Sequence, residues 1–185
     1  MNSDPKHTAR EDGTDAAAGL ARLNEMVAPD AKAALMGCCG SVRWAAEMAH
    51  RRPFGGLDAI LNAADEVWFG LTRADWLDAF SHHPRIGETN LAQAKFVKTA
   101  EQSGNEQSGM ADASDEIRRE FAAGNAEYER KFGHVFLICA SGKSGVFMLE
   151  QVRARMRNDA ATELAKAAKE QSMIVRMRLT KLVNG

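Results

Sequence analysis

The chain has 185 residues, of which 24 are Lys or Arg and 25 are Asp or Glu, so its formal net charge is -1. This length suits one domain, and the balanced charge argues against a dedicated nucleic-acid binder, which usually carries a basic excess. No apolar run approaches the roughly 18 residues that a membrane helix needs. The three cysteines include no CxxC pair and predict neither a disulfide framework nor a zinc site, so we expect a cytoplasmic protein with reduced thiols.

The first segment, residues 1–18, contains almost no large apolar side chain. Burial there could not offset the conformational entropy lost on ordering, which predicts a flexible N-terminal tail. We therefore expect one domain over residues 19–185.

From Leu20 onward, apolar residues recur at three- and four-residue spacing, which indicates helices nearly throughout. Ser41 and Ser114 are each expected to cap a helix, Thr72 and Asp75 to form a capping box, and Gly133 to follow the end of a helix. The pattern predicts a single compact all-α domain of seven to eight helices with one short extended segment, His134 to Ala140. The helical stretches lie at about 23–27, 30–39, 42–51, 57–68, 72–80, 91–99, 114–132, 144–157 and 160–182.

The break in the helical pattern after residue 80 is the first candidate for a functional site. It reads His82-His83-Pro84 and ends in a glycine, Gly87. A histidine at a helix end can face a pocket with a pKa near neutrality, which suits general acid–base catalysis. The alternative, favoured by residue type alone, is a surface turn without a task.

A polar loop and an apolar run are the next candidates. Ser103 to Gly109 carries a carboxylate, amides and hydroxyls that could bind a small polar ligand, or could simply be exposed loop. Phe136 to Ala140 cannot pair its main-chain groups within itself, so it needs partners such as a ligand rich in amides, or side chains and water. Cys139 is more simply a small buried hydrophobe than a nucleophile.

The last helix carries one arginine of interest. Arg178 lies three residues after Val175 and four before Leu182, a spacing that puts its guanidinium on or beside the apolar face. There it could receive a carboxylate in a bidentate manner, or extend to solvent.

Taken together, these segments resemble the family of 2-oxo-4-hydroxy-4-carboxy-5-ureidoimidazoline (OHCU) decarboxylases of uric acid degradation. The resemblance covers about Leu20 to Val183, and the order of its motifs is more specific than any one of them. The motifs are Arg52-Pro53-Phe54, His83-Pro84-Arg85-Ile86-Gly87, Ser103-x-x-Glu106-Gln107-x-Gly109, Asn125-x-x-Tyr128-x-x-Lys131-Phe132-Gly133, Phe136 to Ala140, Arg155-x-x-Asn158 and Arg178-Leu179.

The resemblance implies an all-helical homodimer that needs no metal and no organic cofactor, with OHCU as its small-molecule substrate. It implies decarboxylation of OHCU to (S)-allantoin and CO2, with His83 as the catalytic acid/base and with Glu106 orienting His83 or the ureido group. The extra His82 leaves open which imidazole faces the pocket. The implied substrate-binding positions are Pro84, Ser103, Gly104, Asn105, Glu106, Gln107, Phe136, Leu137, Ile138, Cys139, Ala140 and Arg178.

Two other interpretations stay open. The chain could be a non-catalytic helical interaction domain derived from the same fold, although such a relative would be expected to have lost His83, Glu106 or Arg178. It could also be a different purine- or hydantoin-type lyase or hydrolase. We expect no added transthyretin-like domain, and the ending Val183-Asn184-Gly185 is not a peroxisomal signal.

Overall fold

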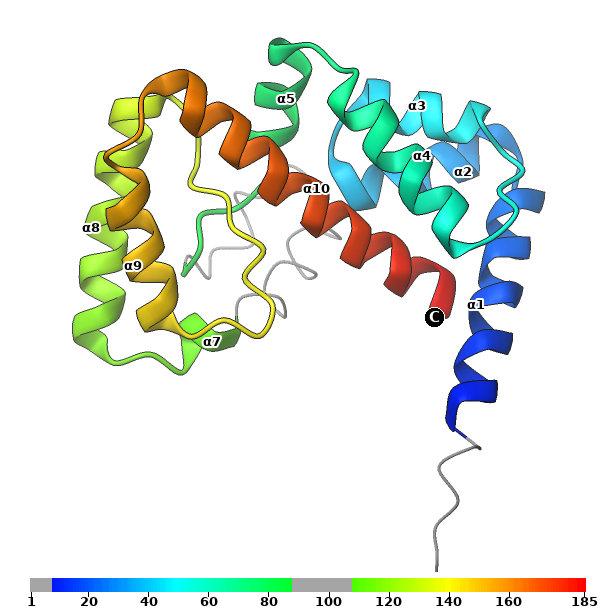
Figure 1. Cartoon of the computed structure of the whole chain (residues 1–185), viewed down its shortest axis with the longest axis horizontal. Coiled ribbons are helices and arrows are strands. Elements are labelled where there is room, and N and C mark those ends of the chain that lie inside the picture. The colour runs from blue at the N-terminus through cyan, green and yellow to red at the C-terminus, as the bar shows by residue number, and fades with distance from the viewer. Residues whose placement is uncertain (1–7, 88–107) are drawn as a thin grey trace, which may run out of the picture. The chain divides into compact units, whose positions relative to one another are not determined.

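The computed structural model describes residues 8–87 and 108–185, with side chains from residue 16 onward (Figure 1). This part of the chain contains nine helices and no β-strand, so the predicted all-α class is confirmed with slightly more helices than expected. The helix expected at 91–99 lies outside the described residues. Contacts between Cα atoms divide the chain into two units, residues 1–71 with 175–185 and residues 72–174.

The first unit is built from four helices and the end of a fifth. Helix α3 packs against both α2 and α4, and α1 contacts α4. Trp44 is fully buried in this unit and its indole Nε1 donates to the Ala64 carbonyl at 3.1 Å, which ties α3 to α4. The helices are α1 (Thr8–Glu25), α2 (Ala28–Cys39), α3 (Val42–His50), α4 (Leu57–Phe69) and the last residues of α10 (Ala160–Asn184).

Helix α1 corrects one expectation about the N-terminus. It begins at Thr8, so residues 8–18 are helical although they were assigned to a flexible tail. The sequence argument weighed only large apolar side chains, whereas Ala16, Ala17 and Ala18 have high intrinsic helix propensity, and the buried Leu20 and Leu23 anchor the rest of the helix. Residues 1–7 lie outside the described residues.

The second unit places two longer helices side by side, α8 (Asp115–Phe132) and α9 (Gly145–Arg155) (Figure 1). It also contains α5 (Arg73–Phe80), α7 (Ser108–Ala111) and the first part of α10. Its core joins α8 and α9 to the expected extended segment. The buried members of this core are Ile86, Met110, Phe121, Tyr128, Phe136, Ile138, Ala140, Met148, Leu149 and Val152.

The helix ends follow the local sequence signals. Ser41 accepts a hydrogen bond from the Trp44 N–H, and Thr72 with Asp75 forms both halves of a capping box. Ser114 caps α8, and Gly133 follows that helix with a left-handed φ of 77°, as glycine allows. The predicted helix boundaries at these four positions are confirmed.

None of the helices in the described part of the chain is long and apolar enough to cross a membrane.

Candidate active site

The turn that follows α5 holds the two neighbouring histidines. After Phe80 the main chain tightens: the His82 N–H donates to the Ala79 carbonyl at 3.2 Å, and the His83 N–H donates to the Phe80 carbonyl at 3.1 Å. Hydrogen bonds to the carbonyl three residues earlier are typical of the last turn of a helix. Pro84 prevents the helix from continuing. The predicted break therefore forms, and both imidazoles leave the chain from one tight turn.

The two imidazoles differ in their surroundings. The His82 side chain is 9% exposed, and its Nε2 lies 3.9 Å from the Asp78 Oδ1 one helical turn earlier. The His83 side chain is half-buried. His82 is thus packed against its own helix, whereas His83 is less deeply buried.

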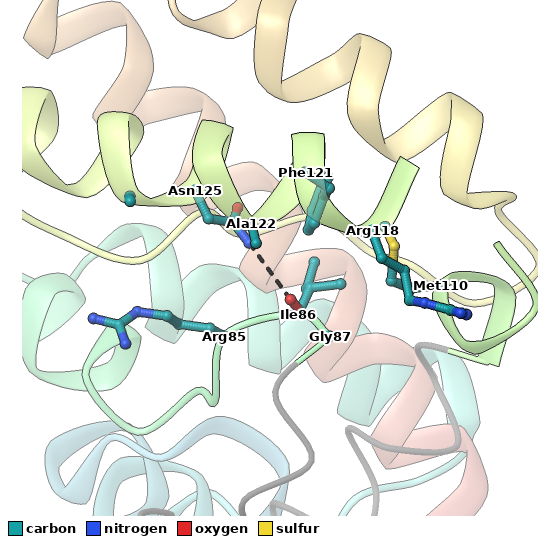
Figure 2. A pocket seen from close by; sticks show the side chains of 9 residues that line it. Arg85, Ile86, Gly87, Met110, Arg118, Phe121, Ala122 and Asn125 are labelled. Carbon is teal, nitrogen blue, oxygen red and sulfur yellow. Dashed lines mark hydrogen bonds between the residues drawn. The ribbon is translucent and has the colours of Figure 1, made fainter. Parts of the chain in front are cut away.

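The residues after the proline are bound to α8. Arg85 and Glu129 form a two-point ion pair, with Nε to Oε1 at 2.6 Å and Nη2 to Oε2 at 2.9 Å. The Ile86 side chain enters the core, and its carbonyl accepts from the Asn125 Nδ2 at 3.5 Å (Figure 2). Because α8 binds both Arg85 and Ile86, the direction in which the chain leaves the His83 turn is fixed.

A cavity of about 290 Å³ lies beside this turn (Figure 2). Its walls include Ile86, Met110 and Phe121, which are apolar, and Arg85 and Arg118 also line it. Asn125 also lines the cavity and is 4% exposed, and its Oδ1 has no hydrogen-bond partner among the described residues. Of the described residues that the resemblance assigns to the substrate, none lines this cavity.

The expected extended segment connects α8 to α9 and has neither helical nor strand structure. The side chains of Phe136, Ile138 and Ala140 enter the core of the second unit. The Phe136 ring packs edge-on against Tyr128, with 5.1 Å between ring centroids. The segment is therefore fixed by side-chain packing, whereas its main-chain groups need other partners.

Buried charged side chains supply two of those partners. Arg155 Nη1 donates to the Leu137 carbonyl at 2.6 Å, and the Cys139 N–H donates to Glu170 Oε2 at 2.9 Å. The Ala140 carbonyl accepts from the Lys143 N–H at 2.9 Å in the following turn.

Glu163 is the centre of the polar network behind Arg155. Its carboxylate is 0% exposed and accepts from the Tyr128 hydroxyl in a short hydrogen bond, from Arg155 Nε at 2.8 Å and from Asn158 Nδ2 at 2.7 Å. Burial, followed by the bond to Glu163, raises the pKa of Tyr128 above its ordinary value, so this phenol stays a donor. Arg155 Nη2 also lies 2.6 Å from Glu163, which pairs the buried charges.

His134, at the start of the segment, packs among aromatic rings. Its ring centroid lies 5.3 Å from that of Phe80 and 5.5 Å from that of Tyr128. Burial lowers the pKa of His134 below its ordinary value of 6.5. This histidine therefore joins the end of α5 to the start of the segment through ring packing.

The residues assigned to the site by the resemblance do not all lie in the same unit. Arg178 lies in the first unit, on α10, and is 1% exposed, so the interpretation in which it extends to solvent is wrong. Ser103, Gly104, Asn105, Glu106 and Gln107 lie outside the described residues. His83, Pro84 and residues 136–140 belong to the second unit.

Across residues 8–87 and 108–185, no group of three or more His, Cys, Asp or Glu side chains is arranged to hold a metal ion.

The OHCU decarboxylase family model matches residues 24–180. The chain belongs to the OHCU decarboxylase family. The recognition that rested on the order of the motifs is thereby confirmed.

Relatives of known name agree with this family. The chain is 40% identical over 146 residues to the uric acid degradation bifunctional protein TTL of Arabidopsis thaliana, covering 78% of the chain and 45% of that protein. It is 27% identical over 139 residues to the 2-oxo-4-hydroxy-4-carboxy-5-ureidoimidazoline decarboxylase of Mus musculus, covering 75% of the chain and 78% of that protein. The chain thus spans less than half of the bifunctional plant protein.

Solved structures show the same fold. A crystal structure of OHCU decarboxylase in the presence of (S)-allantoin matches with a TM-score of 0.70 and 33% identity, covering 81% of this chain and 96% of that one. A crystal structure of (S)-allantoin synthase matches with a TM-score of 0.69 at 14% identity, covering 89% and 53%, which supports the fold alone.

Two acidic residues on α10 were missed by the sequence analysis. Glu163 and Glu170 are seven residues apart, and the alanine pair at 167 and 168 between them is fully buried. A helix presents residues seven apart on one face, so two carboxylates in register with an apolar face were a detectable signal of buried polar contacts.

Proposed function

We propose that this family member decarboxylates OHCU to (S)-allantoin and CO2 without a cofactor. The observation that carries the proposal is the agreement of the family match over residues 24–180 with the structural match to OHCU decarboxylase in the presence of (S)-allantoin. The His83 to Gly87 motif and the Phe136 to Ala140 segment, on which the sequence resemblance rested, both lie in one compact unit.

The chemistry of the substrate explains why the chain's own side chains could suffice. OHCU carries a carboxylate and a hydroxyl on one ring carbon, and a C=N bond begins at the next carbon. When the C–C bond to CO2 breaks, its electron pair moves toward that C=N, which acts as the electron sink that a cofactor provides elsewhere. The resulting enol-type intermediate then takes up a proton on one face, and that face sets the configuration of allantoin.

We assign the acid–base role to His83. The imidazole would polarise or deprotonate the hydroxyl and assist delivery of the proton, since imidazole is the side chain most often used in general acid–base catalysis. Glu106 would orient His83 or the ureido group. Arg178 would hold the carboxylate or neighbouring oxygen atoms, a task suited to a buried guanidinium.

Substrate contacts would come from the other assigned positions. The main-chain groups of Phe136 to Ala140 would bind the ring and ureido amides, and Pro84 with the Ser103 to Gln107 loop would complete the contacts. Homodimerisation and a cytoplasmic location are further parts of the proposal, and light scattering would test the former by a mass twice that of one chain.

Substitution of the neighbouring histidines tests the assignment. We expect His83→Ala to lower kcat with freshly generated OHCU by roughly 10²–10⁴-fold, the usual contribution of a general acid–base group. His82→Gln is the matched control, because it removes the adjacent imidazole in the same turn and should keep most of the rate. Full turnover by His83→Ala would show that the acid–base assignment is wrong.

A further inference from the structure

The main chain between Phe136 and Ala140 has two unequal edges. The side chains of Phe136, Ile138 and Ala140 belong to one core, whereas Leu137 and Cys139 are not members of it. This alternation is the period of two of an extended chain. In such a chain, the N–H and C=O of one residue point to one edge and those of the next residue point to the opposite edge.

The edge formed by residues 137 and 139 is occupied by charged side chains. Arg155 Nη1 binds the Leu137 carbonyl at 2.6 Å, and Glu170 Oε2 binds the Cys139 N–H at 2.9 Å. Arg155 is 4% exposed and Glu170 is 5% exposed. Hydrogen bonds to ionised groups are stronger than neutral ones, and at such depth they are costly to break, so this edge is firmly held.

Both charged groups are themselves held in place. Glu163 fixes the guanidinium of Arg155 through its Nε at 2.8 Å and its Nη2 at 2.6 Å. The Arg155 guanidinium also lies over the Phe136 ring, 4.5 Å from its centroid. Lys166 Nζ lies 2.9 Å from the second carboxylate oxygen of Glu170, one helical turn earlier on α10.

The main-chain groups on the opposite edge differ in their hydrogen bonding. Among the described residues, no hydrogen bond reaches the main-chain N–H or C=O of Phe136 or Ile138. Ile138 is nevertheless only 6% exposed. Buried main-chain groups almost always have a partner, so this donor–acceptor pair is suited to a ligand that brings both an acceptor and a donor.

We infer that Arg155 and Glu170 are positioning residues that hold the Leu137 and Cys139 edge, so that the N–H and C=O of Ile138 face the ligand. The chemical class that fits is a cyclic ureide, whose neighbouring C=O and N–H pair with the N–H and C=O of one extended residue. The inference rests on the proposed function, since it takes residues 136–140 as the substrate contact. It adds two side chains to which neither the resemblance nor the acid–base chemistry gives a role.

Glu170 offers the sharpest test, because a matched series can separate its hydrogen bond from its charge. We expect Glu170→Ala to raise KM for freshly generated OHCU about tenfold and to change kcat by less than about threefold, since binding is lost equally in ground and transition states. Glu170→Gln keeps an acceptor for the Cys139 N–H and should recover most of the loss. Glu120→Gln, in the exposed pair with Arg153, should match the wild type.

Two outcomes of the kinetic experiment would overturn the inference. One is a folded Glu170→Ala protein whose KM stays within about twofold of the wild-type value. The other is a fall in apparent kcat at unchanged KM, which is what a smaller folded fraction would produce.

A second measurement does not depend on turnover and remains available if Glu170→Ala does not fold. In NMR spectra of folded Glu170→Gln, the Cys139 amide proton should move upfield and exchange faster, because its acceptor has lost a full charge. An unchanged Cys139 amide would overturn the inference. If the wild type instead gave racemic allantoin at the uncatalysed rate, the proposed function would fail while this amide measurement would still decide the positioning role.

Discussion

At the residue scale, the carboxylate of Glu163 in the second unit is buried among its partners. Glu163 accepts from three side chains on three different elements, namely Tyr128 on α8, Arg155 on α9 and Asn158 after it. An ionised carboxylate without such partners would be very unfavourable at 0% exposure. The network therefore fixes where α8, α9 and the first part of α10 meet.

His134 should make the stability of the protein depend on pH. Burial lowers its pKa in the folded state below the ordinary value of 6.5, so the unfolded chain binds a proton first as the pH falls. The free energy of unfolding is then highest above pH 6.5 and declines as the pH drops below that value.

Urea denaturation at pH 7.5 and pH 5.5 would measure this dependence. We expect His134→Gln to reduce the loss of stability between the two pH values. His50→Gln is the control, because His50 is exposed at the end of α3 and its replacement should leave the difference as in the wild type. An equal loss in His134→Gln and wild type would contradict the role given to this ring.

At the element scale, the end of α1 depends on one arginine. Arg52 Nη1 donates to the carbonyls of Leu23 at 2.6 Å, Asn24 at 3.3 Å and Met26 at 2.7 Å, and its Nε donates to the Ala49 carbonyl at 3.0 Å. These carbonyls have no partner further along their helices. Arg52 thus joins the C-terminal ends of α1 and α3 within the first unit.

We expect Arg52→Ala to lower the free energy of unfolding by about 2–3 kcal/mol, because several hydrogen bonds to a charged group are lost together. The neighbouring Arg51 provides the control: it pairs with Glu66 at 2.8 Å on the surface, and its replacement by Ala should cost about 0.5 kcal/mol or less. Equal midpoints of chemical denaturation for the two variants would contradict the capping role of Arg52.

Helix positions could be predicted from sequence because their causes are local. The Thr72–Asp75 capping box, the Ser114 cap and the left-handed Gly133 all formed as the residue pattern indicated. Local signals did not show why position 109 needs glycine. An added Cβ at Gly109 would lie 1.9 Å from the Lys143 carbonyl oxygen. That requirement depends on a close approach between α7 and the start of α9, which no spacing along the chain encodes.

The candidate site was predictable only in part, for a related reason. The His83-Pro84 turn and the extended segment could be predicted from residue type and residue order. The contacts of Glu163 and Glu170 with Arg155 and Cys139 join positions 8 and 31 residues apart, and such pairings depend on how the helices pack. The roles of His83, Glu106 and Arg178 came from the resemblance, and they remain predictions.

At the scale of the whole molecule, the chain combines two units that share one long helix. Residues 160–174 of α10 belong to the second unit and residues 175–184 to the first. The family match runs through both units, from residue 24 to residue 180. The part matched by the family thus includes α2 to α5, α7 to α9 and most of α10.

The proposed activity converts OHCU to a single enantiomer of allantoin. OHCU also decays spontaneously, so a rate alone is a weaker test than the configuration of the product. Circular dichroism of allantoin formed from freshly generated OHCU measures that configuration directly. We expect the signal of (S)-allantoin at a rate above the uncatalysed one, whereas racemic product at the uncatalysed rate would contradict the proposed activity.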